Sequence, residues 1–171
     1  MIGNDVIDLA QSRLESQWQR KGFVGKLFTD AEQKLIADHN NPEMLLWLLW
    51  SMKEAAYKIY NRQTKIREYI PKKLICSINC LDTSNSEGEV ICNNNRYYIK
   101  SVIRNENIFT VAVSIPEDLD NIIEIERKDI LKDESGIPYL ITNIYPYKRD
   151  VSISHHGRFE QIVTLKANKQ N

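Results

Sequence analysis

Apolar side chains recur with helical spacing in the stretch "NPEMLLWLLWSMKEAAYKIYN", residues 41–61. Asn41 stands where an N-cap is expected, Pro42 takes the first helical position, and Glu43 lies near the positive end of the helix dipole. These signals predict an amphipathic helix over residues 42–61. The i, i+3, i+4, i+7 pattern of its buried face is carried by Leu45, Leu48, Leu49, Met52, Ala55, Ala56 and Ile59.

Shorter stretches with strand-type patterns follow in two zones. From about residue 74 to residue 126, "GEVICN", "RYYIKSVIR" and "IFTVAVSI" are separated by "NNN" and "NEN", which are typical of hairpins, and "NIIEIE" comes next. After the turn "KDESGIP" come "YLIT", "DVSISHH" and "FEQIVTLKA", whereas "DTSNSEGE" is interpreted as a polar loop. Ahead of the helix, "MIGNDVIDL" predicts a short strand, and "FTDAEQKLIADHN" predicts a helix with a capping box of Thr29 and Glu32. The order of these helices and strands along the chain predicts an α+β fold whose antiparallel sheet packs on the 42–61 helix.

Composition narrows the class of protein. The 171 residues include 23 basic and 23 acidic side chains, so net charge gives no reason to expect a nucleic-acid or membrane partner. The N-terminus lacks the pattern of a signal peptide, and no apolar run approaches the roughly 20 residues that a bilayer requires. Cys76, Cys80 and Cys92 have no histidine or CxxC nearby, which predicts neither a disulfide framework nor a zinc site. We expect three buried thiols in a reducing cytoplasm.

Glu54 and Lys58 lie on a stripe beside the apolar one. They are one turn apart and share that stripe with Trp47 and Trp50. One interpretation is a surface ion pair on an amphipathic helix. The other starts from the two tryptophans, which indicate that this face is also covered, and a covered carboxylate is costly without a cation or metal. Glu54 is therefore a candidate metal ligand.

A second carboxylate is available in "GNDVIDL". A magnesium-type ion needs more than one carboxylate, and phosphate oxygens usually complete its shell. Gly3 permits a close backbone approach, and Asp5 follows inside an apolar strand, although a turn or strand-end role is the alternative. In a regular strand Asp5 and Asp8 point to opposite faces, so Asp5 is the preferred partner of Glu54 and Asp8 the weaker candidate.

These residues carry a resemblance to the 4′-phosphopantetheinyl transferase superfamily. "GNDVIDL" resembles its G-x-D-[IV]-x-[ED] motif, "WSMKEAAYK" its [FW]-x-x-K-E-A-x-x-K motif, and "KLFTDAEQ" its F-T-x-x-E helix start. "DESGIPYL" followed by "DVSISHHGRF" resembles its closing G-K-P and S-[IL]-[ST]-H segment. The motif order, and an acid three residues after the motif aspartate, are similar to the small holo-acyl-carrier-protein synthases. We expect one domain over residues 1–171, with an extra strand-rich segment around 74–116 that resembles the larger enzymes.

The resemblance implies a site for coenzyme A and Mg²⁺. Asp5 and Glu54 would hold the metal, and Glu54 and Lys58 would act in catalysis. The residues expected to contact coenzyme A are Lys53, Lys58, Ser154 and His155, with His156 incidental. The family's G-K-P lysine is Ile137 here. One cationic contact is therefore missing, or it is replaced by Arg158, Lys148 or Arg149.

The implied activity is transfer of 4′-phosphopantetheine from coenzyme A to a serine of an acyl or peptidyl carrier protein. Magnesium would orient the pyrophosphate, 3′,5′-ADP would leave, and Glu54 or a metal-bound water would serve as base. The alternative, which Ile137 keeps open, is a non-catalytic relative that binds a carrier protein or a nucleotide without turnover. A magnesium-dependent nucleotide hydrolase is a third reading, but the sequence has no Gly-rich phosphate loop.

Two expectations concern partners. The acidic recognition helix of carrier proteins needs a basic surface, which "SRLESQWQRKGFVGK" offers through Arg13, Arg20, Lys21 and Lys26; a solvated face is the alternative. Arg13 and Arg20 would share a helical face if this segment is helical. Each motif occurs once, so the chain corresponds to one half of the larger, fused enzymes. We therefore expect a homo-oligomer, with a trimer as first choice and sites between subunits.

Overall fold

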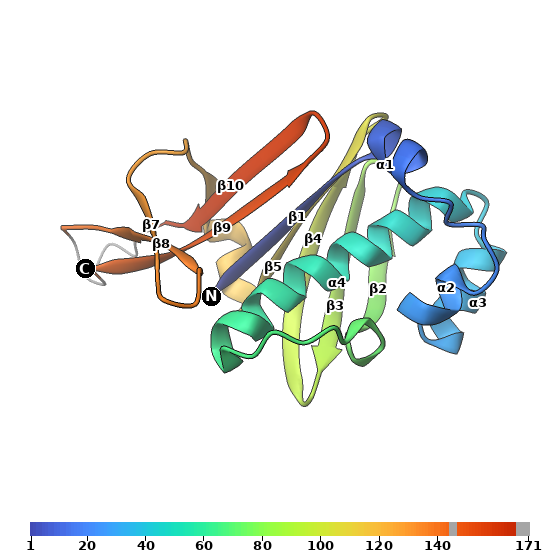
Figure 1. Ribbon diagram of the computed structural model, residues 1–171, viewed down its shortest axis with the longest axis horizontal. Helices are drawn as coiled ribbons and strands as arrows, with labels where there is room; N and C mark the ends of the chain where they lie inside the picture. The colour runs from blue at the N-terminus through green and yellow to red at the C-terminus, as the bar shows by residue number, and fades with distance from the viewer. Residues whose placement is uncertain (144–146, 167–171) are drawn as a thin grey trace.

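The computed structural model describes residues 1–143 and 147–166 and contains two five-stranded antiparallel sheets, one of which packs on a long helix (Figure 1). The first sheet has the order β1-β5-β4-β3-β2 and the second has the order β6-β10-β9-β8-β7. This architecture confirms the predicted α+β fold class. The strands are β1 (Ile2–Asp8), β2 (Ile75–Leu81), β3 (Asn85–Cys92), β4 (Asn95–Ile103), β5 (Asn107–Val113), β6 (Ile122–Glu124), β7 (Ile130–Lys132), β8 (Pro138–Ile141), β9 (Lys148–His156) and β10 (Phe159–Leu165).

The long helix α4 (Pro42–Thr64) is the helix that the apolar pattern predicts, continued to Thr64. Its N-cap is Asn41, whose side chain accepts a hydrogen bond from the amide of Met44 at 3.1 Å. All seven residues of the predicted apolar face are at most 1% exposed, and they belong to the main core under the first sheet. Burial of this face, more than intrinsic propensity, therefore holds the helix in place.

Three shorter helices precede α4: α1 (Leu9–Glu15), α2 (Phe23–Leu27) and α3 (Asp30–Asp38). The predicted capping box is present at α3, where Thr29 and Glu32 exchange side chain to backbone hydrogen bonds. Helix α1 ends at Glu15 because Ser16 is extended, and Arg20 lies in the turn that follows. The prediction that Arg13 and Arg20 share one helical face is therefore wrong.

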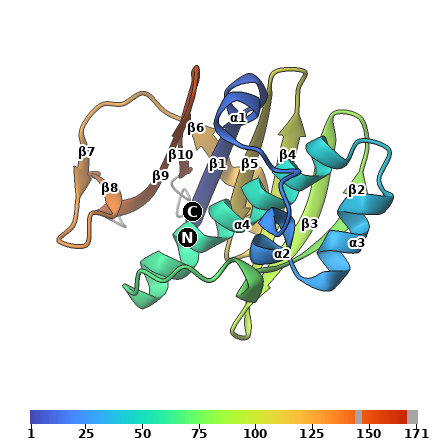
Figure 2. The ribbon, with the colours of Figure 1, turned by 45° about the vertical axis from the view of Figure 1, so that its right-hand side comes forward.

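Strand β1 is the edge strand of the first sheet that lies against the second sheet. It pairs with β5 and also packs on α4, β9 and β10 (Figures 1 and 2). A Cβ at Gly3 would collide with the carbonyl of Ala55 on α4, so this glycine is what allows the strand and helix to approach so closely. Ile2 and Val6, on the opposite face, pack with Val163 of β10. Successive β1 side chains thus alternate between the α4 side and the β9–β10 side.

Some predicted boundaries differ from the structure. The interpretation of "DTSNSEGE" as a loop is wrong from Asn85 onward, because β3 begins there and turns Ser86 and Gly88 inward. Cys80 is exposed on β2, so the prediction of three buried thiols is wrong at this position. The expected strand "NIIEIE" is limited to Ile122–Glu124, and Ala167 at the end of "FEQIVTLKA" lies outside the described residues.

None of the helices among the described residues combines the length and hydrophobicity that a bilayer span requires.

Candidate functional site

A cavity of about 320 Å³ opens where β1, α1, α4 and β9 meet. Asp5 of β1, Glu54 of α4, and His155 and His156 of β9 all line it, together with Trp47 and other residues of α1 and α4. Three segments that are far apart in the sequence are therefore brought to one place. Asp5 reaches this cavity because the odd-numbered residues of β1 face α4.

The pKa values of both carboxylates are raised. Burial raises the pKa of Asp5 to about 6, opposed by the nearby charge of Lys58. Burial also raises the pKa of Glu54 to about 7, and the negative charge of Asp5 adds to this rise. Both shifts show that this site disfavours two bare negative charges. A cation bound by the carboxylates would stabilise their charged forms and so oppose both shifts.

Lys58 connects the two sheets at this site. Its Nζ donates to the carbonyl of Asn4 at 2.6 Å and to the carbonyl of Ile153 at 3.0 Å. Burial lowers the pKa of Lys58, while Asp5 and Glu54 raise it. An ammonium group has three N–H donors, so within the described part of the chain one donor is left for another acceptor. Lys58 therefore both braces β1 against β9 and presents a positive charge beside the carboxylates.

Strand β9 supplies the S-I-S-H residues. Ser154 is 5% exposed, and its Oγ has no hydrogen-bond partner among residues 1–143 and 147–166. His155 is exposed and lines the cavity. His156, which was predicted to be incidental, accepts a hydrogen bond at Nδ1 from the amide of Asp8 at 2.8 Å. No local sequence pattern indicates this contact, because it joins residues 148 positions apart.

Lys53 does not line this cavity. It is 1% exposed, and its Nζ binds Glu32 at 2.9 Å and the carbonyls of Pro71 at 2.8 Å and Leu74 at 2.5 Å. These three contacts use all three donors of the ammonium group. The structure thus disagrees with Lys53 as a contact for coenzyme A, because no donor remains for a phosphate. The cause is the direction of Lys53, which points from α4 toward the segment that leads into β2.

Asp8 and Arg158 form a second ionic contact, on the other face of β1. Arg158 donates from Nε to Oδ2 of Asp8 at 2.8 Å and from Nη2 to Oδ1 at 3.0 Å. These bonds hold the pKa of Asp8 well below its usual range. Asp8 is therefore occupied by Arg158, and it faces away from Asp5 and Glu54, as the regular strand predicts.

The cations considered as replacements at Ile137 are engaged elsewhere. Arg158 binds Asp8, Arg149 donates to the carbonyl of Leu165, and Lys148 lies over the ring of Tyr139 at 3.9 Å from its centroid. Ile137 itself is buried, at 7% exposure. The geometry therefore gives no support to a replacement of the missing lysine by these three side chains.

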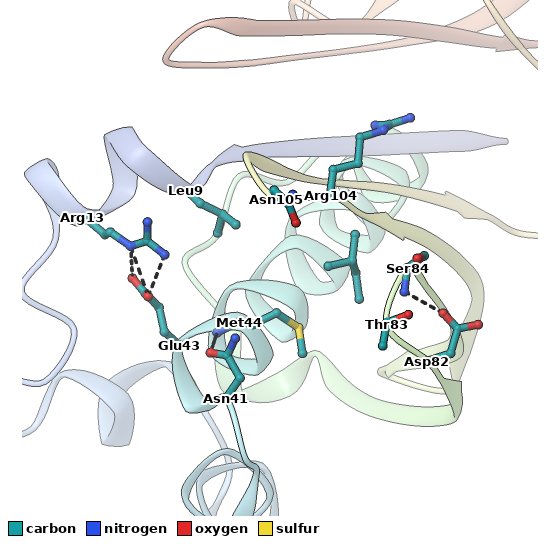
Figure 3. A pocket seen from close by; sticks show the side chains of 11 residues that line it. Leu9, Arg13, Asn41, Glu43, Met44, Asp82, Thr83, Ser84, Arg104 and Asn105 are labelled. Atoms are coloured by element: carbon teal, nitrogen blue, oxygen red, sulfur yellow. Dashed lines mark hydrogen bonds and ion pairs between the residues drawn. The ribbon is translucent and has the colours of Figure 1, made fainter.

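The cations expected to meet a carrier protein lie along α1 and the turn after it. Arg13 forms a forked contact with Glu43, at 3.0 Å from Nε and 3.1 Å from Nη2, and faces a cavity of about 650 Å³ between α1, α4 and two hairpin turns (Figure 3). Arg20 lies over the ring of Phe23 at 5.4 Å, and Lys21 is exposed. This larger cavity contains neither Asp5 nor Glu54, so it is separate from the carboxylate site.

The carboxylate site fits a hard divalent cation. Asp5 Oδ2 is buried and has no hydrogen-bond partner in the part of the chain that the structure describes. Within residues 1–143 and 147–166 no group of three or more His, Cys, Asp or Glu side chains could hold a metal. Asp5 and Glu54 would thus supply two carboxylates, with the other ligands from phosphate or water, which is the usual manner of Mg²⁺.

Comparison with known proteins gives one family match. The family model described as the 4′-phosphopantetheinyl transferase superfamily matches residues 1–113, about two thirds of the 171-residue chain. No curated protein shows significant similarity to the chain. The matched region holds both carboxylates, both α4 lysines and the whole first sheet. Phosphopantetheinyl transfer with coenzyme A as substrate, typically with a divalent metal, is the activity of this family. The chain therefore belongs to the 4′-phosphopantetheinyl transferase superfamily.

Proposed function

We propose that this protein transfers the 4′-phosphopantetheine group of coenzyme A to a serine hydroxyl of an acyl or peptidyl carrier protein, with Mg²⁺ and with release of 3′,5′-ADP. The observation that carries the proposal is the pair Asp5 and Glu54. These two carboxylates stand at the family's motif positions, line one cavity with the S-I-S-H strand, and are both disfavoured as bare charges. Lys58 beside them supplies one positive charge.

The reaction makes and breaks one bond at phosphorus. The serine oxygen forms a bond to the phosphorus nearest pantetheine, the bond from that phosphorus to the bridging oxygen breaks, and 3′,5′-ADP carries away the electron pair. Magnesium, when bound by Asp5 and Glu54, neutralises phosphate charge and orients the pyrophosphate. The free donor of Lys58 binds a phosphate oxygen, and His155 and the Ser154 hydroxyl contact coenzyme A from β9.

Glu54 is the candidate base on this chain. The serine proton must leave as its oxygen bonds to phosphorus, and a base acts best when its pKa lies near the working pH. With a pKa raised to about 7, the carboxylate of Glu54 accepts a proton near neutrality, which an exposed glutamate does poorly. A metal ion held by Glu54 would lower this pKa, so the roles of ligand and of base would compete at Glu54.

In the decisive experiment the purified protein is incubated with coenzyme A, MgCl₂ and an apo-carrier protein, and the mass of the carrier is then measured by mass spectrometry. We expect one added phosphopantetheine group and an equal amount of 3′,5′-ADP. A matched reaction with the Ser→Ala carrier controls for non-specific acylation. The alternative, a non-catalytic relative, predicts that the protein binds coenzyme A or the carrier in calorimetry while the carrier mass stays constant. That result, obtained with several acyl and peptidyl carriers, would overturn the proposal.

We also propose that the protein works as a homo-oligomer, with a trimer as first choice. The chain carries one copy of each motif, and residues 1–171 would then act as one unit of the assembly. In an active monomer, by contrast, the walls that β1, α4 and β9 of one chain already form would be sufficient. Light scattering together with activity at nanomolar concentration decides between the two. An active monomer would show that the site is complete within one chain.

A further inference from the structure

Two residues at the tip of the β9–β10 hairpin, His156 and Arg158, bind a single residue, Asp8, at the end of β1. His156 accepts from the backbone amide of Asp8 at 2.8 Å, and the backbone amide of Arg158 donates to Asp8 Oδ2 at 3.0 Å. The guanidinium of Arg158 adds two bonds to the carboxylate, at 2.8 and 3.0 Å. Asp8 is 1% exposed, so this contact is closed to water on the side of the carboxylate.

The middle residue of the turn must be small. Gly157 has a φ of +54°, a conformation that favours glycine, and a Cβ there would lie 2.5 Å from Oδ2 of Asp8. A larger residue would push the carboxylate out of its contacts. The sequence "HHGR" is thus shaped around Asp8, and we call the set Asp8, His156, Gly157 and Arg158 the Asp8 latch.

The Asp8 latch connects the start of α1 with the hairpin. Asp8 is the N-cap of α1 and accepts from the amides of Ala10 at 3.0 Å and Gln11 at 3.3 Å. At the other end of α1, Glu15 lies 3.3 Å from Nε2 of His156. Because the Asp8 amide donates to Nδ1, that nitrogen is unprotonated, and Nε2 can carry the proton toward Glu15. The hairpin therefore contacts α1 at both of its ends.

A third segment joins through Arg158. Its Nη1 donates to Glu106 Oε1 at 2.9 Å, and the carbonyl of Glu106 accepts from the amide of Leu9 at 2.9 Å. The turn between β4 and β5, the start of α1 and the β9–β10 turn thus meet at one guanidinium. Figure 1 shows the tip of the β9–β10 hairpin reaching toward α1.

We propose that Asp8 and Arg158 are positioning residues, which hold the β9 wall of the cavity at its working distance from Asp5 and Glu54. This inference rests on the proposed function. Ser154 and His155 lie near the end of β9, four and three residues before Arg158 in the turn that follows, whereas the carboxylates lie on β1 and α4. A latch at the strand end sets how closely these two walls approach. Neither Asp8 nor Arg158 lines the cavity, so both act through the placement of Ser154 and His155.

The test compares variants that remove the ion pair but keep the fold. Asp8→Asn retains an N-cap for α1, because asparagine caps as well as aspartate, but it loses the charged fork to Arg158. Arg158→Met removes the guanidinium, and Arg158→Lys keeps the charge without the fork. The matched control is Arg127→Met, which breaks the exposed contact between Arg127, in the segment after β6, and Glu160 of β10. Each variant is assayed for transfer and for amide hydrogen exchange along β9 and β10.

For Arg158→Met and Asp8→Asn we expect the KM for coenzyme A to rise about tenfold, with kcat changed less than about threefold, because a charge-assisted bidentate contact is lost without loss of a reacting group. Amides of residues 151–160 should exchange at least about tenfold faster. Arg158→Lys should recover part of both effects, and Arg127→Met should behave as wild type.

Two outcomes would overturn the inference. One is a lowered melting temperature with unchanged KM and unchanged exchange in the hairpin, which would leave the latch a purely structural contact. The other is equal effects in Arg127→Met. Failure of the proposed function is a different result, in which the wild-type protein neither binds coenzyme A nor modifies a carrier. In that case the exchange data alone decide whether Asp8 and Arg158 fix the hairpin.

Discussion

Helix α4 carries two ionic clusters, centred on Lys53 and Lys58, which differ in whether their charges are satisfied. Around Lys53, one ammonium meets one carboxylate, Glu32, and two carbonyls, and Glu32 accepts further bonds from the amides of Cys76 and Thr29. Around Lys58, one ammonium stands beside two carboxylates, Asp5 and Glu54.

The difference indicates which cluster is open to a ligand. The Lys53 cluster is charge-balanced and fully hydrogen-bonded, so it contributes to the position of the segment before β2. The Lys58 cluster has a net negative charge when all its groups are ionised, borders a cavity, and contains a buried carboxylate oxygen, Asp5 Oδ2, that has no partner among the described residues. An incomplete polar cluster costs stability, which a divalent cation and phosphate groups would restore.

The largest expected effect is on catalysis. Asp5→Asn and Glu54→Gln should each lower the rate of transfer by about 10³-fold or more, because charge stabilisation at the phosphate depends on both carboxylates. Circular dichroism should show an unchanged fold. The matched control is Glu87→Gln, which removes an exposed carboxylate from β3. Full activity in either site variant, with magnesium still required, would refute the assignment.

Lys53→Met should cost about 3 kcal/mol in the free energy of unfolding, because it leaves Glu32 buried without its ammonium partner. Urea denaturation measures this value. Lys100→Met breaks an exposed pair with Glu87 and should change stability by less than about 0.5 kcal/mol. At a temperature where it stays folded, Lys53→Met should bind coenzyme A like wild type. Weakened binding with intact stability would reverse the roles of the two clusters.

The pH dependence of stability should distinguish the clusters as well. In buffer with a chelator, the folded protein holds the pKa values of Asp5 and Glu54 above their ordinary values of 3.8 and 4.5. The contribution of these two groups to the free energy of unfolding is therefore fully present below about pH 4 and is lost as the pH rises through about 6 and 7. The free energy of unfolding of Asp5→Asn should therefore exceed that of wild type by about 2 kcal/mol at pH 8 and equal it near pH 4. Magnesium at pH 8 should reduce the gap. A gap that is the same at both pH values would contradict the raised pKa.

Lys58→Met and His155→Ala should weaken coenzyme A binding about tenfold, since each removes a polar or charged phosphate contact. Carrier affinity should remain unchanged in both. Isothermal calorimetry measures the two affinities separately, and His39→Ala, which removes a half-buried histidine ahead of α4, is the control. Unchanged coenzyme A affinity in both variants would show that the open cluster does not bind phosphate.

The smallest expected effect lies outside both clusters. Arg13→Ala and Arg20→Ala should raise the KM for the carrier protein by about threefold, because exposed charges contribute little each and are screened by salt. The effect should vanish at about 0.5 M NaCl. Arg96→Ala, which removes an exposed cation from β4, is the control. Equal effects from Arg96→Ala would exclude a localised basic docking surface.

Local patterns in the sequence determined most of the elements. The apolar face of α4, its Asn41 and Pro42 start and the Thr29 capping box depend on residues within one or two turns of each other, so they can be predicted from spacing alone. The opposed directions of Asp5 and Asp8 follow in the same way from the period of a strand. The motif positions also pointed to Asp5, Glu54 and His155, which the structure gathers at one cavity.

Only the tertiary structure decided how neighbouring charges are used. Lys53 and Lys58 have similar local surroundings in the sequence, yet one meets Glu32 and the other meets Asn4 and Ile153, from strands at opposite ends of the chain. The Asp8 latch likewise joins residues 150 positions apart. Periodicity reports which face of an element is buried, but it does not report what that face is buried against. The pKa of a buried group depends on those distant partners, because in a desolvated site each nearby charge and hydrogen-bond donor has a large effect on the energy of the charged form.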